Sequence, residues 1–167
     1  MVMLADIFSE ARFHNDLNQI TQIDTTPLTY DLQGNLTNDG SQKYVWDIRG
    51  RLREVHDAQD NLIARFEYDA YGRRVTKYSA STAKTEHFYY DGWRVVEEYV
   101  DGSLTARNVW GLYLDETVVR TSVADGKDYY PCLNPIYSPL RIYDGSANLI
   151  TRAKYTPYGK PTLMDAQ

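Results

Sequence analysis

The chain has little of what several classes of functional site require. Its 167 residues include a single cysteine, Cys132, which excludes an internal disulfide and a metal site built from several thiolates. The three histidines, His14, His56 and His87, are scattered and show no ligand spacing. We therefore expect no metal and no cofactor.

A basic surplus and a long apolar run are missing as well. Lys and Arg number 18 against 23 Asp and Glu, a net charge of −5, so the attraction that dominates binding to a phosphate backbone is absent and no nucleic-acid partner is expected. No segment approaches the roughly 20 apolar residues that cross a bilayer, so we expect no membrane insertion. The apolar start MVMLADIF contains Asp6 and no basic residue, which makes it a poor signal peptide.

Aromatic residues, in contrast, are plentiful. Fifteen tyrosines, three tryptophans and four phenylalanines favour strands over helices. The length suits one domain of the usual size, about 100–150 residues, or a piece of a larger one. A β-rich fold is the first prediction.

One short phrase recurs along the chain. An aromatic residue is followed by a turn-forming residue, most often Asp, and then by Gly in LTYDLQGNLT, YVWDIRGRLR, FEYDAYGRRV, FYYDGWRVVE and AKYTPYGKPT, which begin at Leu28, Tyr44, Phe66, Phe88 and Ala153. Such a repeat predicts stacked copies of one structural unit. The anchoring aromatic residues are Tyr30, Trp46, Tyr68, Tyr90 and Tyr155, with weaker candidates at His14, Trp110 and Tyr130.

The phrase predicts a hairpin corner. Asp at the first position of a type I turn accepts backbone N–H groups, and Gly three places later adopts the left-handed conformation that makes a bulge. Thr156-Pro157-Tyr158-Gly159 is expected to form the same turn with other residues, because proline already has the φ angle that the second position requires. The predicted structural turn residues are Asp31, Gly34, Asp47, Gly50, Asp69, Gly72, Asp91, Gly92 and Gly159.

Between the corners the sequence alternates with the period of a half-buried strand, as in residues 62–68 and 149–155. Polar loops at 57–61, 101–103 and 144–148 join the other strand ends through a second type of turn. We predict an all-β fold of repeated antiparallel β-hairpins over residues 13–167. Residues 1–12 are an N-terminal extension, and within it residues 2–12 suit either a short helix or a fraying end.

The order of the variants, from YDLQGNLTNDG through YVWDIRGRLREV, FEYDAYGRRVTK and HFYYDGWRVVEEY to NLITRAKYTPYGK, resembles the YD-repeat or Rhs (rearrangement hot spot) proteins, in the segment leading into their Rhs-associated core. The resemblance covers residues 13–165. It implies a β-spiral or partial shell of hairpins, secreted or at the cell surface. In bacterial polymorphic toxins and insecticidal toxin complexes such a shell encloses a toxic C-terminal domain, and in teneurins it serves adhesion.

Two departures limit what the resemblance implies. The chain stops at Gln167, so no cleavage residue or effector can be carried over, and we expect a fragment of a larger shell. Pro131, Pro135 and Pro139 interrupt a region that is regular in the family, and they predict an irregular ladder there. The expected partners are other shell segments or a second copy, pairing through the exposed sheet edges.

The leading functional hypothesis is a non-enzymatic structural module. The repeated carboxylates Asp31, Asp47, Asp69 and Asp91 raise the alternative of a glycoside hydrolase, but each already has a role at its turn. Cys132 has no basic activator beside it in the sequence. A second alternative is a carbohydrate- or protein-binding module, because a single-layered sheet leaves part of a dense aromatic strip exposed, here Tyr89, Trp93, Tyr99, Trp110 and Tyr113.

Overall fold

The computed structural model describes residues 10–113 and 115–165. Those residues form strands β1 to β17 and no helix, which confirms the predicted all-β class. The helix considered for residues 2–12 falls mostly outside the described residues, and Arg12 begins β1. No helix in the described part of the chain is long and apolar enough to cross a bilayer.

The chain divides into two compact units. Unit 1 holds residues 10–72 and 77–83, and unit 2 holds residues 73–76 and 84–165, so that β9 (Arg74–Ser79) has residues in both. The strands of unit 1 are β1 (Arg12–His14), β2 (Ile20–Ile23), β3 (Thr26–Pro27), β4 (Thr29–Tyr30), β5 (Leu36–Asn38), β6 (Gln42–Trp46), β7 (Leu52–Asp57) and β8 (Leu62–Tyr68).

Unit 2 continues the same plan with longer strands. Its strands are β10 (Lys84–Asp91), β11 (Arg94–Val100), β12 (Ser103–Trp110), β13 (Thr117–Ser122), β14 (Lys127–Leu133), β15 (Pro139–Asp144), β16 (Leu149–Tyr155) and β17 (Pro161–Asp165).

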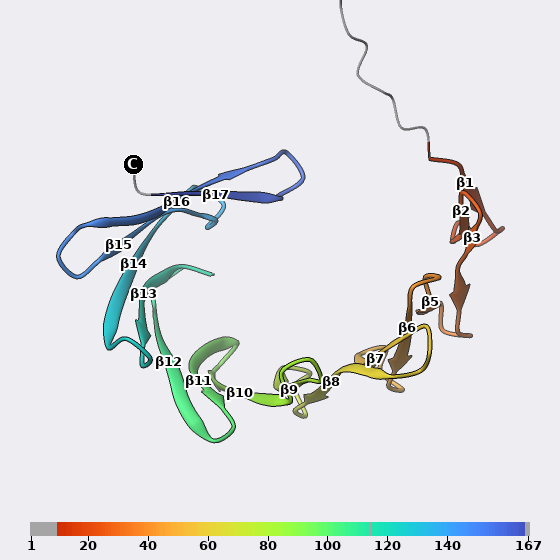
Figure 1. Cartoon of the computed structure of the whole chain (residues 1–167), viewed down its shortest axis with the longest axis horizontal. Helices are drawn as coiled ribbons and strands as arrows, with labels where there is room; N and C mark the ends of the chain where they lie inside the picture. Colours follow the sequence, from red (N-terminus) through yellow and green to blue (C-terminus); the bar gives the residue numbers. More distant parts are fainter. Residues whose placement is uncertain (1–9, 114, 166–167) are drawn as a thin grey trace, which may run out of the picture. The chain divides into compact units, whose positions relative to one another are not determined.

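Within each sheet, strands that are neighbours in sequence lie side by side, and their pairing is antiparallel. In unit 1, β1-β2-β3 form a small sheet and β4 to β8 follow one another in a second, while in unit 2 β10 to β17 follow one another in order (Figure 1). This arrangement confirms the predicted hairpin array. Burial along β8 alternates as the sequence predicts, with Ile63, Arg65 and Glu67 on the exposed face.

The sheets have almost no enclosed core. Among the described residues only Val55 and Ala106 are buried hydrophobic side chains, and no large side chain is fully buried. Large apolar side chains such as Ile48 and Leu112 are more than four-fifths exposed. A packed domain of this length normally buries many large side chains, so these sheets are single layers whose faces remain open.

In several hairpins the ladder is shifted by one residue at the same place. The shifts lie directly before Tyr30, Trp46, Tyr90 and Trp110, where the strand enters its corner. A shift also occurs between Cys132 and Leu133, within the region where the prolines predict an irregular ladder. Because shifts of the same kind occur in hairpins without proline, this one is a property of the corner rather than of the prolines.

Candidate functional site: linked hairpin corners and an adjoining cavity

The corner at Asp31 shows how the repeated phrase folds. Oδ1 of Asp31 accepts the N–H groups of Gln33 and Asn35, both at 2.9 Å, and Gly34 donates its N–H to the Asp31 carbonyl with φ at 86°. The side-chain amide of Asn35, followed by these backbone donors, lowers the pKa of Asp31. Asp47 accepts from Arg49 and Arg51 in the same way, and the Arg51 N–H is the main cause of its lowered pKa.

The remaining predicted turn residues lie at corners of two kinds. Asp69 accepts the N–H of Tyr71 at 2.9 Å, and Gly72 donates to the Asp69 carbonyl, as at the first two corners. Gly159, with φ at 79°, closes the corner that begins at Thr156. Asp91 differs, because it pairs with Arg94 across a two-residue turn made by Gly92 and Trp93.

The same corner also occurs at residues outside the set of predicted turn residues. Asn15 and Asn134 each accept two backbone N–H groups through Oδ1, two and four residues ahead, so an amide oxygen replaces the carboxylate. The corner expected after Tyr130 begins instead at Leu133-Asn134. Asp57 and Asp144, assigned to a second turn type, also make the corner hydrogen bonds. The missed signal is Asn or Asp followed four residues later by a polar residue.

Successive corners are linked by the anchoring aromatic residues. Each ring donates a hydrogen bond to the carbonyl of the first or second residue of the strand that leaves the preceding corner. The pairs are Tyr30 to Ile20, Trp46 to Leu36, Tyr68 to Leu52, Tyr90 to Arg74, Trp110 to Val95 and Tyr155 to Pro139, all at 2.7–2.8 Å. Tyr and Trp serve equally because both combine an apolar ring with a donor at its far end. We call this set of bonds the corner ladder.

Arginines reach from a corner toward the next one. Arg51 donates to the Asp69 carbonyl at 3.2 Å, and its guanidinium lies 4.8 Å from the centre of the Tyr68 ring. Arg73 donates to the Gly92 carbonyl and lies equally close to the ring of Tyr90. Neighbouring corners are therefore joined by an aromatic residue in one direction and an arginine in the other.

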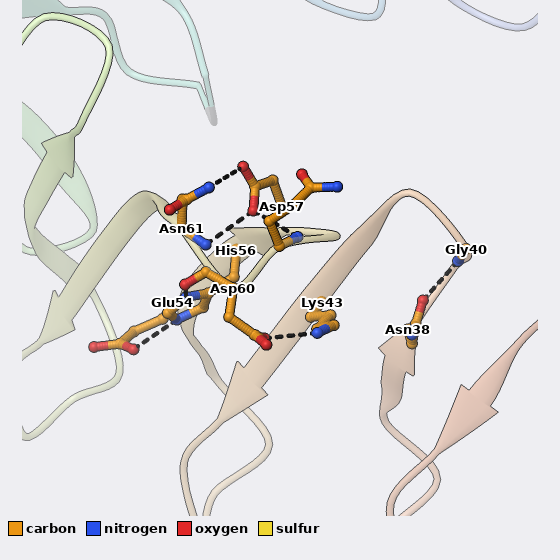
Figure 2. Close-up of polar contacts among 9 residues, drawn as sticks. Asn38, Gly40, Lys43, Glu54, His56, Asp57, Asp60 and Asn61 are labelled. Atoms are coloured by element: carbon orange, nitrogen blue, oxygen red, sulfur yellow. Dashed lines mark hydrogen bonds and ion pairs between the residues drawn. The ribbon is translucent and has the colours of Figure 1, made fainter.

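A polar cluster occupies the opposite end of the β7-β8 hairpin (Figure 2). His56 lies between Glu54, whose Oε2 is 2.9 Å from Nε2, and the Asp60 carbonyl, 3.1 Å from Nδ1. The hydrogen bond with Glu54 is the main cause of a raised His56 pKa, and the same bond lowers the pKa of Glu54. Lys43 reaches Asp60 from β6 at 2.7 Å. Charged side chains thus hold this end together in place of aromatic rings.

Within the described residues of unit 2, the corner ladder is interrupted at Leu133. Leu133 occupies the anchoring position and has no donor for the carbonyl of Thr117, the first residue of the strand that leaves the preceding corner. The tight corner after Trp110 is also replaced by a longer loop, closed by the Gly111 N–H donating to the Glu116 carbonyl at 2.8 Å. Thr117 and Trp110 both line the cavity described next.

The cavity has a volume of about 450 Å³ and lies on one face of strands β11 to β15. Its apolar lining comes from Trp93, Val95, Trp110, Pro131, Pro139 and Ile142. A polar cluster stands on the same wall: Arg120 makes a two-pronged ion pair with Glu98, with Nη2 2.9 Å from Oε2, and Asn108 bonds to both. The hydrogen bond from Arg120 is the main cause of a lowered Glu98 pKa, so Glu98 is charged at neutral pH.

The predicted aromatic strip is divided by the sheet. Trp93 and Trp110 line the cavity. Tyr99 adjoins Glu98 in β11 and so points to the other face, where it packs edge-to-face with Tyr89 at 5.1 Å between ring centres. Tyr113 stacks on Tyr137 at 6.4 Å. The strip is therefore not one continuous surface.

The geometry offers little support for catalysis. Asp31, Asp47 and Asp69 each direct a carboxylate oxygen to the backbone of their own turn, as a structural role requires. Cys132 is free and exposed. Within residues 10–113 and 115–165, no three His, Cys, Asp or Glu side chains are grouped closely enough to hold a metal ion.

The Teneurin YD-shell family model matches residues 10–166. The chain belongs to the YD-shell family. This confirms the resemblance to YD-repeat proteins and makes the corner ladder a feature of a YD-shell segment.

The curated relatives are much longer proteins. The segment is 28% identical to the tRNA nuclease WapA of Bacillus subtilis strain 168 and 26% identical to mouse Teneurin-1, over 91% and 80% of its length. It spans only 6% of each of these relatives. The whole-protein activities of these relatives therefore do not transfer to the segment on similarity alone.

Solved structures show the same fold. The Photorhabdus luminescens Tc holotoxin pore structure contains a chain that superposes with a TM-score of 0.61 over 95% of the segment, at 18% identity and over 10% of that chain. The crystal structure of TcdB2-TccC3-TEV gives a TM-score of 0.54 at 17% identity. The segment thus has the architecture found in part of these toxin assemblies.

Proposed function

We propose that this YD-shell segment is a wall element of a larger hollow shell that houses a toxic effector domain, and that it has no catalytic role itself. The observation that carries the proposal is the open single-layered sheet, in which only Val55 and Ala106 are buried hydrophobic side chains among the described residues. Such a sheet needs further strands and a filled interior to cover its apolar faces. The chain matches 6% of the length of a relative named a tRNA nuclease, which supports the role of one part of a longer toxin.

The edges of the segment suit this role. Among the described residues β17 pairs only with β16, through five residue pairs from Thr151↔Asp165 to Tyr155↔Pro161. An unpaired strand edge presents N–H and C=O groups that another strand can complete. The proposed partners are accordingly neighbouring hairpins of the same shell.

The mass of the native product tests the proposal. An antibody raised against the 167-residue chain should detect a polypeptide far larger than 19.3 kDa in the organism that encodes it. Limited proteolysis of that product should leave its C-terminal effector intact until the shell is denatured. A soluble monomer of 19.3 kDa as the only product would contradict the proposal.

The absence of a catalytic role has its own test. Asn should replace Asp31, Asp47 or Asp69 with similar, small effects on thermal stability, because an amide oxygen can accept the same backbone N–H groups. Asp91, which lies at a two-residue turn, is replaced in parallel to complete the set of repeated carboxylates. A glycoside hydrolase would instead lose turnover at one particular position. Measurable sugar hydrolysis that disappears with one substitution would establish the enzymatic alternative.

A further inference from the structure

Another cavity of unit 2 lies on strands β14 to β17, which follow one another at the end of the described chain (Figure 1). Its volume is about 460 Å³, within the usual range for small-molecule sites of roughly 300–1,000 Å³. Among the described residues that line it, none is Asp or Glu, and three are basic: Arg141, Arg152 and Lys154. We call this cavity the cationic pocket.

The register of the sheet brings the two arginines directly opposite each other. Arg141 of β15 pairs with Arg152 of β16, and Cys132 and Met164 extend this row onto β14 and β17. Side chains of directly paired residues stand on one face, with Cβ atoms about 4.5–5.5 Å apart. Lys154 lies two positions after Arg152 in β16, so it belongs to the same face. Three cationic side chains are therefore gathered on one face of two adjacent strands.

These charges have no partner in the part of the chain that the structure describes. The side chains of Arg141, Arg152 and Lys154 form no ion pair or hydrogen bond with any described residue, and Nε of Arg152 is buried without an acceptor. Like charges placed directly opposite on a sheet destabilise it, and a buried donor without an acceptor adds to that cost. A bound anion would remove both costs.

The carboxylates of the neighbouring hairpins are engaged elsewhere. Asp144 accepts the N–H groups of Ser146 and Asn148 in its own turn, both at 2.9 Å. Asp128 of β14 accepts the hydroxyl of Thr121 at 2.6 Å. The chain as a whole has a net charge of −5, so the cationic pocket is a local concentration of positive charge and not part of a general basic surplus.

The three cations suit a ligand with two negative charges and several acceptor oxygens. A guanidinium group binds phosphate through two parallel N–H···O bonds, and an ammonium group adds a compact point charge. A carboxylate has one charge and two oxygens, for which a single arginine is sufficient. A phosphate monoester has a charge of about −1.5 to −2 at pH 7 and three strong acceptor oxygens. It can therefore use both arginines and the lysine at once.

The remainder of the pocket wall is largely apolar. Leu133, Leu140 and Met164 line it, and Leu140 is 40% exposed. A free phosphate ion would leave these side chains and most of the volume in contact with water. An organic group attached to the phosphate would cover them and gain the free energy of apolar burial.

We propose that the cationic pocket binds a small phosphate monoester with an apolar organic group. The phosphate lies between Arg141 and Arg152 and is also contacted by Lys154. The organic group packs on Leu140 and Met164. The site is additional to the shell role, because a wall element can form with or without it.

The experiment titrates the 167-residue chain at neutral pH and constant ionic strength and follows the arginine Nε–H signals by NMR. The probes are phenyl phosphate, inorganic phosphate, succinate and benzyl alcohol. Phenyl phosphate should shift the signals of Arg141 and Arg152. Inorganic phosphate lacks the apolar group, succinate has its two charges on carboxylates and benzyl alcohol is uncharged, so each should bind about tenfold more weakly or less.

Substitutions of the arginines separate binding from stability. Arg141→Gln and Arg152→Gln should each weaken the binding of phenyl phosphate by about tenfold or more. The urea midpoint of the unliganded chain should stay the same or rise in both variants, because each removes one of two opposed like charges. Arginines with a purely structural role would instead lower that midpoint when they are replaced.

The lysine provides a matched pair of variants with the same change of charge. Lys154→Gln removes an exposed cation of the pocket and should weaken binding without affecting folding. Lys127→Gln is the control, because Lys127 begins β14 and does not line the pocket, and it should bind as the parent does.

Four results would overturn the proposal: no shift of either arginine signal, equal affinity for phenyl phosphate and inorganic phosphate, tighter binding of succinate than of phenyl phosphate, or equal effects of Lys154→Gln and Lys127→Gln. The last would reduce the binding to a general attraction of charge. Shell assembly of the native product would be unaffected by any of these outcomes, so failure of this proposal is distinguishable from failure of the shell role.

Discussion

The corners at Tyr68 and Leu133 have the same backbone and different surroundings. At both, an oxygen of Asp69 or Asn134 accepts backbone N–H groups and a left-handed residue, Gly72 or Tyr137, completes the turn. Only the first has a ring that donates to the preceding strand, from the Tyr68 hydroxyl to the Leu52 carbonyl at 2.8 Å. The bend therefore depends on local chemistry, whereas the linkage between bends depends on the anchoring residue.

The interrupted link at Leu133 lies next to the cavity of unit 2. The cavity spans strands on both sides of that corner, and it is lined by Thr117, whose carbonyl has the position that a ring would otherwise reach. Cavities of about 590 and 500 Å³ also adjoin the unbroken links at Tyr68 and Trp46, so the missing ring at Leu133 changes the lining of the space and does not create it. Four experiments test the difference between the two corners, and they follow in descending order of expected effect.

The largest effect is expected for Gly72→Ala. Gly72 has φ at +86° and nothing within 4 Å of an added Cβ, so the substitution introduces backbone strain without a clash. The left-handed conformation should destabilise the chain by about 1–2 kcal/mol, measured by urea unfolding. Gly145→Ala is the matched control, because Gly145 also has open space and lacks a positive φ. Equal effects of the two substitutions would show that the corner does not require the left-handed residue.

The next effect is expected for Tyr68→Phe. The substitution keeps the ring and removes the hydroxyl that bonds to the Leu52 carbonyl, which should lower the free energy of unfolding by about 1 kcal/mol. Tyr158→Phe is the control, since Tyr158 is 99% exposed. If Tyr68→Phe is neutral in the same assay, the ladder bonds do not stabilise the sheet.

A smaller effect is expected when the two kinds of corner acceptor are exchanged. Asn134→Asp keeps an oxygen for the N–H groups of Ile136 and Ser138, and it should change the unfolding free energy by less than about 0.5 kcal/mol. Asn134→Ala removes that oxygen and should lower it by about 1 kcal/mol. If Asn134→Asp and Asn134→Ala change the free energy of unfolding equally, the side-chain oxygen contributes nothing to the bend.

The corners and the corner ladder differ in how far the sequence predicts them. The corners at Asp31, Asp47 and Asp69 and the alternation in β8 are predictable, because each depends on residues within a few positions. The corner ladder is not predictable in this way, since Tyr68 and Leu52 are joined only after the strands have paired. The corner at Asn134 is hard to predict because Tyr130 is the more obvious aromatic residue of that region, and the cavity is not predictable because five strands together form it.

The smallest effect is expected from His56, at the end of the hairpin that has no ladder. Its pKa is raised above the ordinary value of 6.5, chiefly by the hydrogen bond with Glu54. The protonated form is therefore favoured in the folded chain, and the stabilisation is complete below pH 6.5 and disappears as the pH rises through the folded pKa. The urea midpoint should fall slightly between about pH 6 and pH 8. His56→Gln and Glu54→Gln should each flatten that slope, because either one removes the pair. A slope that persists in both variants would show that another group titrates in this range and that the His56–Glu54 pair does not stabilise this end of the hairpin.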